Sequence, residues 1–209
     1  MPILTRLEPQ KKDRERVNLY IDDEFFCGAS LDTVVALRLY KGKEINVFEL
    51  DNIKKQSGEQ DLYLKTINYI MSGLRTRREI AGYLRKKNAE QELVDNIIMR
   101  LEKGGLINDT SYANMFTSQK SAKMGKAAIK NKLYQKGVSS DVIEQALLEV
   151  SDDDQAELVE SVADKYMRAK EPTRENFNKL YRYLAAKGFD FDLVAETVNK
   201  RRGGYEDRD

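Results

Sequence analysis

Apolar residues along most of this chain recur every three or four positions, the spacing that places them on one face of an α-helix. The same pattern occurs three times. Leu84 and Leu133 are 49 residues apart, and Leu133 and Leu184 are 51 residues apart. Each of these leucines lies four residues after one aliphatic residue and fourteen residues before another. A repeat of this kind predicts tandem helical modules that bury their apolar faces against one another.

Each module is expected to contain three helices. Residues 59–107 form the first predicted repeat, residues 108–151 the second and residues 152–202 the third. The middle helices end at equivalent positions, which hold Asn88, Gly137 and Gly188. These residue types readily enter the left-handed conformation that closes many helices, so the shared stop supports a true repeat. Residues 203–209 lack periodicity and are expected to form a disordered tail.

Residues 1–58 follow a different pattern, which predicts a small α+β extension. Residues 16–21 alternate between apolar and polar, as in a half-buried strand. Asp22-Asp23 suits a tight turn, and residues 24–29 are expected to form the antiparallel second strand of a β-hairpin. The expected fold is therefore mainly α, with three tandem three-helix repeats in an elongated curved array and a small N-terminal hairpin-and-helix cap.

Two helices are expected after the hairpin. Ser30 is suited to cap a helix over residues 31–40, and Asn46 to cap another over residues 47–55. A break is predicted near Ser57-Gly58, because glycine weakens a helix interior.

The composition argues against catalysis. The chain of 209 residues has no histidine and one cysteine, Cys27, so zinc sites and Cys/His or Ser/His catalytic pairs cannot be built. It contains no glycine-rich phosphate-binding loop. Asp22-Asp23 and residues 152–154 are acidic enough for magnesium but are typical of a turn and a solvated linker. We expect no enzymatic activity, no cofactor and no metal.

Apolar runs near the roughly 20 residues needed to cross a bilayer are absent, and so is the apolar stretch of a secretory signal. Cys27 cannot form an internal disulfide and suits a reducing compartment. These observations predict a cytoplasmic protein without a membrane partner. A repeat array with its own N-terminal cap also predicts a monomer.

Charge is unevenly distributed, although the formal net charge is only +1. Residues 75–136 contain 14 Lys/Arg against 6 Asp/Glu, whereas residues 137–171 contain 3 against 10. A basic segment followed by an acidic one favours oriented docking on a partner of mixed charge or on a polyanion.

A first group of candidate binding residues begins the middle helix of the first repeat. Arg75, Arg77 and Arg78 lie there, although the helix dipole disfavours cations at that end. The placement indicates a bound anion or an acidic partner, the alternative being an ordinary solvated helix face.

A second group lies in the second repeat. Lys123, Lys126 and Lys130 share one arc of the middle helix, about 60° wide at 100° per residue, with Tyr134 beside it. Together they can present charge and an aromatic ring to a phosphate backbone. A solvated lysine face is again the alternative.

Several segments carry a family resemblance. They are residues 74–80 (LRTRREI) with 83–87 (YLRKK), residues 101–109 (LEKGGLIND) with Tyr112-Ala113, residues 132–138 (KLYQKGV) and residues 184–189 (LAAKGF). Together they resemble the RecX family of bacterial recombinase regulators in order and spacing. Residues 16–44 are also similar to the N-terminal extension of some longer family members.

The resemblance implies three tandem three-helix repeats and a non-enzymatic role. Such a protein is expected to bind the RecA–single-stranded-DNA filament, with weak direct DNA contact, and mainly to inhibit the recombinase in DNA repair and recombination. The chain departs from the family pattern at Arg75-Thr76, often Arg-Ser, at Asn88, usually glycine, and at Asn108-Asp109, usually an acidic pair. None of these departures removes a known active group.

Two other functions stay open. Residues 76–81, 93–101 and 104–107 also resemble a winged-helix DNA-binding transcriptional regulator. That fold needs a β-hairpin after its recognition helix, whereas this chain passes through Asn108-Asp109 into another expected helix. The third possibility is a helical-repeat scaffold for some other protein.

Overall fold

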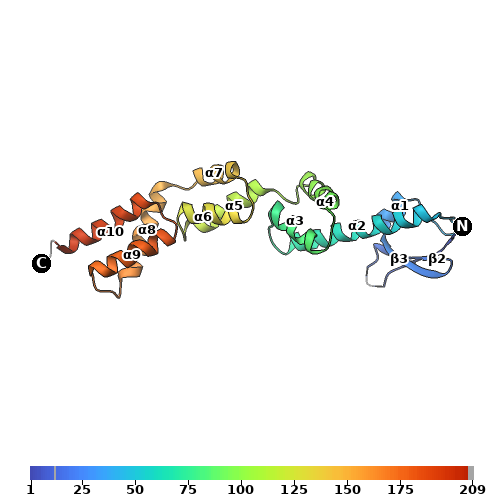
Figure 1. Ribbon diagram of the computed structural model, residues 1–209, viewed down its shortest axis with the longest axis horizontal. Helices are drawn as coiled ribbons and strands as arrows, with labels where there is room; N and C mark the ends of the chain where they lie inside the picture. Colours follow the sequence, from blue (N-terminus) through green and yellow to red (C-terminus); the bar gives the residue numbers. More distant parts are fainter. Residues whose placement is uncertain (12, 207–209) are drawn as a thin grey trace. The chain divides into compact units, whose positions relative to one another are not determined.

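The computed structural model describes residues 1–11 and 13–206. Its described residues form a small antiparallel sheet followed by helices, which confirms the mainly α fold class. The chain divides into two compact units. The first comprises Met1–Gly73 and Ala81–Leu106, and the second comprises Leu74–Ile80 and the residues from Ile107 onward. Figure 1 follows the chain through both units.

Three strands make up the N-terminal sheet, in the order β1 (Leu4–Pro9), β2 (Arg16–Ile21) and β3 (Glu24–Ser30). The predicted hairpin is confirmed as β2–β3. Asp22 and Asp23 have φ angles of 47° and 66°, and two positive φ angles fit the tight turns that join twisted strands.

Strand β1 is an addition to the predicted hairpin. The register of β1 against β2 shifts between Leu4 and Arg6, so the apolar residues Leu4 and Leu7 do not alternate regularly. A bulge of this kind hides the period-2 signal. Leu4 nevertheless belongs to a buried cluster with Val17 and Leu19.

Helices α1 (Leu31–Ala36) and α2 (Val47–Met71) follow the sheet. Their predicted caps are confirmed, because Ser30 accepts from the Thr33 N–H and Asn46 forms a capping box with Glu49. Helix α1 ends four residues before its expected end at Tyr40, and Arg38 just beyond it has a left-handed φ of 49°.

The predicted break at Ser57-Gly58 is wrong, since α2 is continuous and the expected domain boundary at residue 58 lies inside it. Ile53 and Ser57 are buried, and Figure 1 shows α2 beginning beside β3. Tertiary packing therefore outweighs the cost of one glycine, about 1 kcal/mol.

The C-terminal part of α2 and the remaining helices form the tandem repeats. The remaining helices are α3 (Arg77–Lys86), α4 (Gln91–Lys103), α5 (Asp109–Ser121), α6 (Lys126–Gln135), α7 (Ser140–Leu148), α8 (Asp152–Met167), α9 (Arg174–Ala186) and α10 (Phe191–Glu206). The tail predicted to be disordered is helical through Glu206, and residues 207–209 lie outside the described residues.

Equivalent leucines anchor the cores of the second and third repeats. Leu133 is buried with Ile129 and Ile143. Leu184 is buried with Leu180 of the same helix and with residues of α8 and α10. The predicted stop positions are also confirmed, because Asn88, Gly137 and Gly188 have φ angles of 61°, 82° and 81°.

Candidate binding surface

The start of α3 meets the end of α6 within the second unit, at a contact that we call the first joint. Thr76 is fully buried. Its hydroxyl donates to the carbonyl oxygen of Lys136 at 2.7 Å and accepts from the Glu79 N–H at 3.2 Å. The carboxylate of Glu79 accepts in turn from the Thr76 N–H at 3.1 Å. Thr76 therefore caps one helix while it binds the end of another.

An ion pair between Glu79 and Lys136 reinforces the first joint. Burial raises the pKa of Glu79, but hydrogen bonds from the Lys136 ammonium and the Thr76 N–H outweigh it, so the pKa is lowered overall. The hydrogen bond to Glu79 raises the pKa of Lys136. Both groups are therefore held in their charged forms.

The three candidate arginines lie at this joint. The backbone N–H of Arg77 donates to Asp109 at 2.8 Å. The stem of Arg78 covers Gly137, where an added Cβ would lie 2.3 Å from Arg78 Cδ. Arg75 is close enough to Glu79 to contribute to the lowering of its pKa. The chain itself thus places the Asp109 carboxylate at this helix start, and partner binding by the three arginine side chains stays a prediction.

A second joint between α6 and α9 uses equivalent positions. Gly125 takes the place of Thr76, and its N–H donates to the carbonyl oxygen of Lys187 at 3.0 Å. Lys126 takes the place of Arg77, and its ammonium lies 2.6 Å from Asp152. Asp152 begins α8 as Asp109 begins α5. The contact between successive middle helices is therefore itself repeated.

The backbones approach very closely at the second joint. A Cβ on Gly125 would lie 2.0 Å from the carbonyl oxygen of Gly188, and one on Gly188 would lie 2.3 Å from the Ala128 nitrogen. The stop glycines were predicted from the sequence, but the segments that cover them were not. A small residue at equivalent helix starts, Thr76 and Gly125, was the signal that could have found them.

The predicted lysine arc is only partly realised. Lys123 lies in the turn between α5 and α6 and not on the helix, so its placement on that arc is wrong. Lys126 belongs to the second joint, and Lys130 is paired with Glu144 of α7. Tyr134 is 65% exposed. Lys123, Lys130 and Tyr134 thus remain candidates for contact with a partner, whereas Lys126 has a structural contact.

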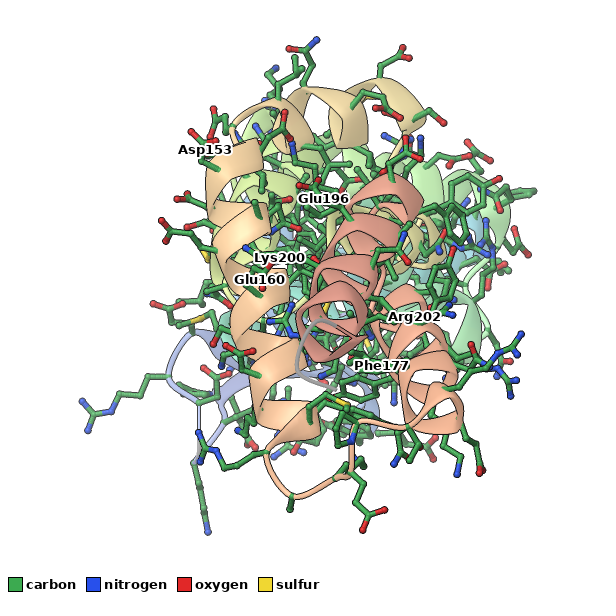
Figure 2. The ribbon with its side chains drawn as sticks, turned by 90° about the vertical axis from the view of Figure 1, so that its left-hand side faces the viewer. Asp153, Glu160, Phe177, Glu196, Lys200 and Arg202 are labelled. Atoms are coloured by element: carbon green, nitrogen blue, oxygen red, sulfur yellow. The ribbon has the colours of Figure 1, made fainter. Side chains whose placement is uncertain are left out.

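The third repeat is closed by a charged cluster between α8 and α10. Arg201 lies 2.6 Å from both Glu160 and Asp164, and Lys200 lies 3.7 Å from Glu160. Figure 2 shows Glu160 of α8 next to Lys200 of α10. This cluster ties the last helix to the first one of the repeat.

Residues 1–11 and 13–206 bring together no group of three or more His, Cys, Asp or Glu side chains that could hold a metal ion. Within the same ranges, the structure contains no helix of sufficient length and apolar character to cross a membrane.

These features define a class: a tandem three-helix-repeat protein with an N-terminal sheet. Residues 2–46 match the Regulatory protein RecX N-terminal domain. Residues 108–147 match the second three-helix domain of RecX, and residues 152–198 match the third.

Relatives match over nearly the whole chain. A Regulatory protein RecX of Clostridioides difficile (strain 630) is 32% identical over 207 residues, which cover 96% of both proteins. One of Bacillus cereus (strain B4264) is 33% identical over 219 residues and covers 99% of this chain and 80% of its own. The chain therefore belongs to the RecX family of regulatory proteins.

Solved structures agree with this assignment. A crystal structure of regulatory protein RecX, 25% identical, superposes with a TM-score of 0.81 and covers 95% of this chain and all of its own. The crystal structure of RecX from Lactobacillus salivarius, 28% identical, has a TM-score of 0.62 and covers 68% of this chain and 96% of its own. The fold and the regulatory class are thus shared with these proteins.

Proposed function

We propose that this protein is a non-enzymatic cytoplasmic regulator that binds the RecA–single-stranded-DNA filament and mainly inhibits the recombinase. The observation that carries the proposal is the match along 96% of the chain to a relative named as a RecX regulatory protein. A filament is a repeating partner, and a tandem-repeat protein is suited to engage several of its equivalent surfaces at once.

The joints support this proposal physically. Hydrogen bonds fix the start of α3 to the end of α6 and the start of α6 to the end of α9. Binding groups on the second unit are therefore held at set spacings before the partner arrives. Preorganisation of this kind reduces the entropy lost on binding.

The winged-helix alternative lacks its wing. Residues 104–108 between α4 and α5 form a turn and contain no strand, and all of them are described by the structure. The chain then enters α5, which begins another repeat.

The proposal is tested by binding to a preformed RecA filament on labelled single-stranded DNA, followed by fluorescence anisotropy. The double variant Lys123→Glu/Lys130→Glu should bind about tenfold more weakly, and wild-type affinity should fall as salt is raised, because phosphate contacts release counterions. Lys126 is left unchanged in this variant because it belongs to the second joint.

Lys132→Glu provides the matched control, since Lys132 is an exposed lysine of α6 that lies outside the predicted arc. It should bind like the wild type. Equal losses in both variants would reject the assigned residues. Absence of any binding to the filament, together with tight binding to bare duplex DNA, would reject the proposed function.

A further inference from the structure

The third repeat carries a surface formed by two tyrosines and three lysines of α8, α9 and the turns that follow them. The rings of Tyr166 on α8 and Tyr183 on α9 are stacked, with centroids 4.6 Å apart and planes inclined by 27°. Lys170 lies 3.2 Å from the centre of the Tyr166 ring, and Lys187 lies 5.4 Å from that of Tyr183. Lys179 lies one helical turn before Tyr183 on α9. We call these five residues the tyrosine–lysine surface.

This surface is open to a partner. Tyr183 is 37% exposed, and Lys179, Tyr183 and Lys187 recur every four residues, so they lie on one face of the helix and its cap. The ammonium of Lys170 is also bonded to the Tyr166 carbonyl oxygen at 2.8 Å. Lys187 is farther from its ring and can turn towards an anion, which would leave the outer face of Tyr183 free for stacking.

Tyrosine stacking is not required to build a repeat. The second repeat has Lys132 at the position of Tyr183, and it still buries Ile129 and Leu133 in its core. The first unit, however, contains a similar arrangement. There Tyr83, equivalent to Tyr183, stacks on Tyr69 at 4.4 Å, with Lys87 5.8 Å from the Tyr83 ring. The recurrence of a stacked tyrosine pair with a nearby lysine favours a binding role in addition to packing.

Charge indicates the kind of partner. Residues 165–187 contain 7 Lys/Arg against 2 Asp/Glu. Glu175 is one of these two acids and is paired with Lys179 at 2.6 Å. A cationic surface with a partly exposed aromatic ring complements a polyanion that carries planar groups. Unpaired bases can stack on such a ring, whereas the bases of a duplex are already stacked on each other.

We propose that the tyrosine–lysine surface is a binding site for single-stranded DNA. A base stacks on the outer face of Tyr183, and the ammonium groups of Lys179 and Lys187 contact the flanking phosphates. The site acts on bare single-stranded DNA, so it does not depend on the proposed filament binding, and either can fail without the other.

The test is a titration of a fluorescein-labelled oligothymidine with the full chain, in the absence of recombinase. Tyr183→Ala should weaken binding about tenfold through loss of one stacked base, whereas Tyr183→Phe, which keeps the ring, should bind like the wild type. Lys187→Ala should lower the magnitude of the slope of log affinity against log salt by about 0.7, the value for one phosphate contact on a single strand.

Lys200→Ala is the matched control, because it removes one exposed lysine from α10 of the same repeat, as Figure 2 shows. It should leave the affinity and the salt slope unchanged. Circular dichroism tests whether each variant is folded. If Tyr183→Ala is unfolded, Lys187→Ala decides the outcome. The proposal would be overturned if folded Tyr183→Ala and Lys187→Ala both bound DNA as tightly as the wild type. It would also be overturned if Lys200→Ala lost as much affinity as they do, or if the wild type did not bind.

Discussion

Two glycines of the second unit lie where even a methyl group has no room. Gly137 and Gly188 close their helices in the left-handed region, at φ angles of 82° and 81°. Each is also covered by the start of another middle helix, through Arg78 and Ala128 respectively. Glycine is thus needed at these positions for two reasons, one of backbone conformation and one of close approach.

The cost of the close approach can be separated from the cost of the backbone conformation by comparison with Gly105. Gly105 has a φ of 67° but open space where its Cβ would be. Gly105→Ala should cost about 1 kcal/mol of unfolding free energy for the backbone alone. Gly188→Ala should cost about 1 to 3 kcal/mol more through overpacking, because backbone atoms of Ala128 are in the way. Urea unfolding measures both values, and equal losses would contradict the close approach at the joint.

The Glu79 carboxylate makes the first joint sensitive to acid. Because the fold lowers its pKa from an ordinary value of 4.5, its contribution to stability is fully present above that value and is lost as pH falls through the lowered pKa. The unfolding free energies of the wild type and Glu79→Gln should therefore converge as the pH falls from neutral to below the ordinary pKa of 4.5.

Glu157→Gln removes an exposed carboxylate from α8, outside the joint, and serves as the control. Its difference from the wild type should not follow the same course. A constant gap between the wild type and Glu79→Gln across this range would show that the Glu79–Lys136 pair does not stabilise the joint.

Local residue chemistry was predictable where its cause lies nearby in the sequence. The left-handed stops at Asn88 and Gly137 and the cap at Asn46 follow from residue type and position. The role of Arg77 does not, because its partner Asp109 is 32 residues away. Its placement at the positive end of a helix did indicate an anion, but not that the chain supplies it.

At the scale of elements, each joint lets the start of one middle helix satisfy groups at the end of the next. The last carbonyls of a helix have no partner within it. Thr76 donates to the Lys136 carbonyl, and Gly125 donates to that of Lys187. The donor to the helix-end carbonyl is thus a side-chain hydroxyl in the first joint and a backbone N–H in the second.

Thr76→Val removes the hydroxyl but keeps the shape of the side chain. It should cost about 2 kcal/mol, since it loses a cap and removes the donor to a partly buried carbonyl. Thr173→Val is the matched control, because Thr173 is exposed and caps α9 through the Asn176 N–H. That change should cost only about 1 kcal/mol. Equal losses in urea unfolding would mean that the bond to Lys136 contributes nothing.

The elements themselves were predicted with uneven success, for physical reasons. The helices of the repeats have a regular apolar period and clear stops. Strand β1 was missed because its bulge interrupts the alternation. The continuity of α2 through Gly58 depends on contacts that a local pattern does not contain.

At the scale of the whole molecule, the third repeat ends the series. Thr76 and Gly125 each lie 8 residues before the equivalent leucine, whereas the cap Thr173 lies 11 before Leu184. Helix α9 therefore begins about a turn earlier and does not present the same joint-forming end. The monomeric state predicted from the sequence stays a prediction.

The tandem organisation and the family could be predicted from the sequence, since both rest on a pattern repeated along the chain. The candidate site could be predicted only in part. Lys123, Lys130 and Tyr134 remain available to a partner, but Lys126 is used within the second joint. Sequence periodicity does not separate an exposed lysine from one that holds two repeats together.

The proposed role of this protein is to restrain a recombinase filament. The most direct measurement is the rate of ATP hydrolysis by RecA preassembled on single-stranded DNA, as this protein is added. Hydrolysis should fall at protein concentrations well below that of RecA, because one bound regulator would affect several protomers. Unchanged hydrolysis at equimolar protein, with the filament intact, would contradict the proposed role.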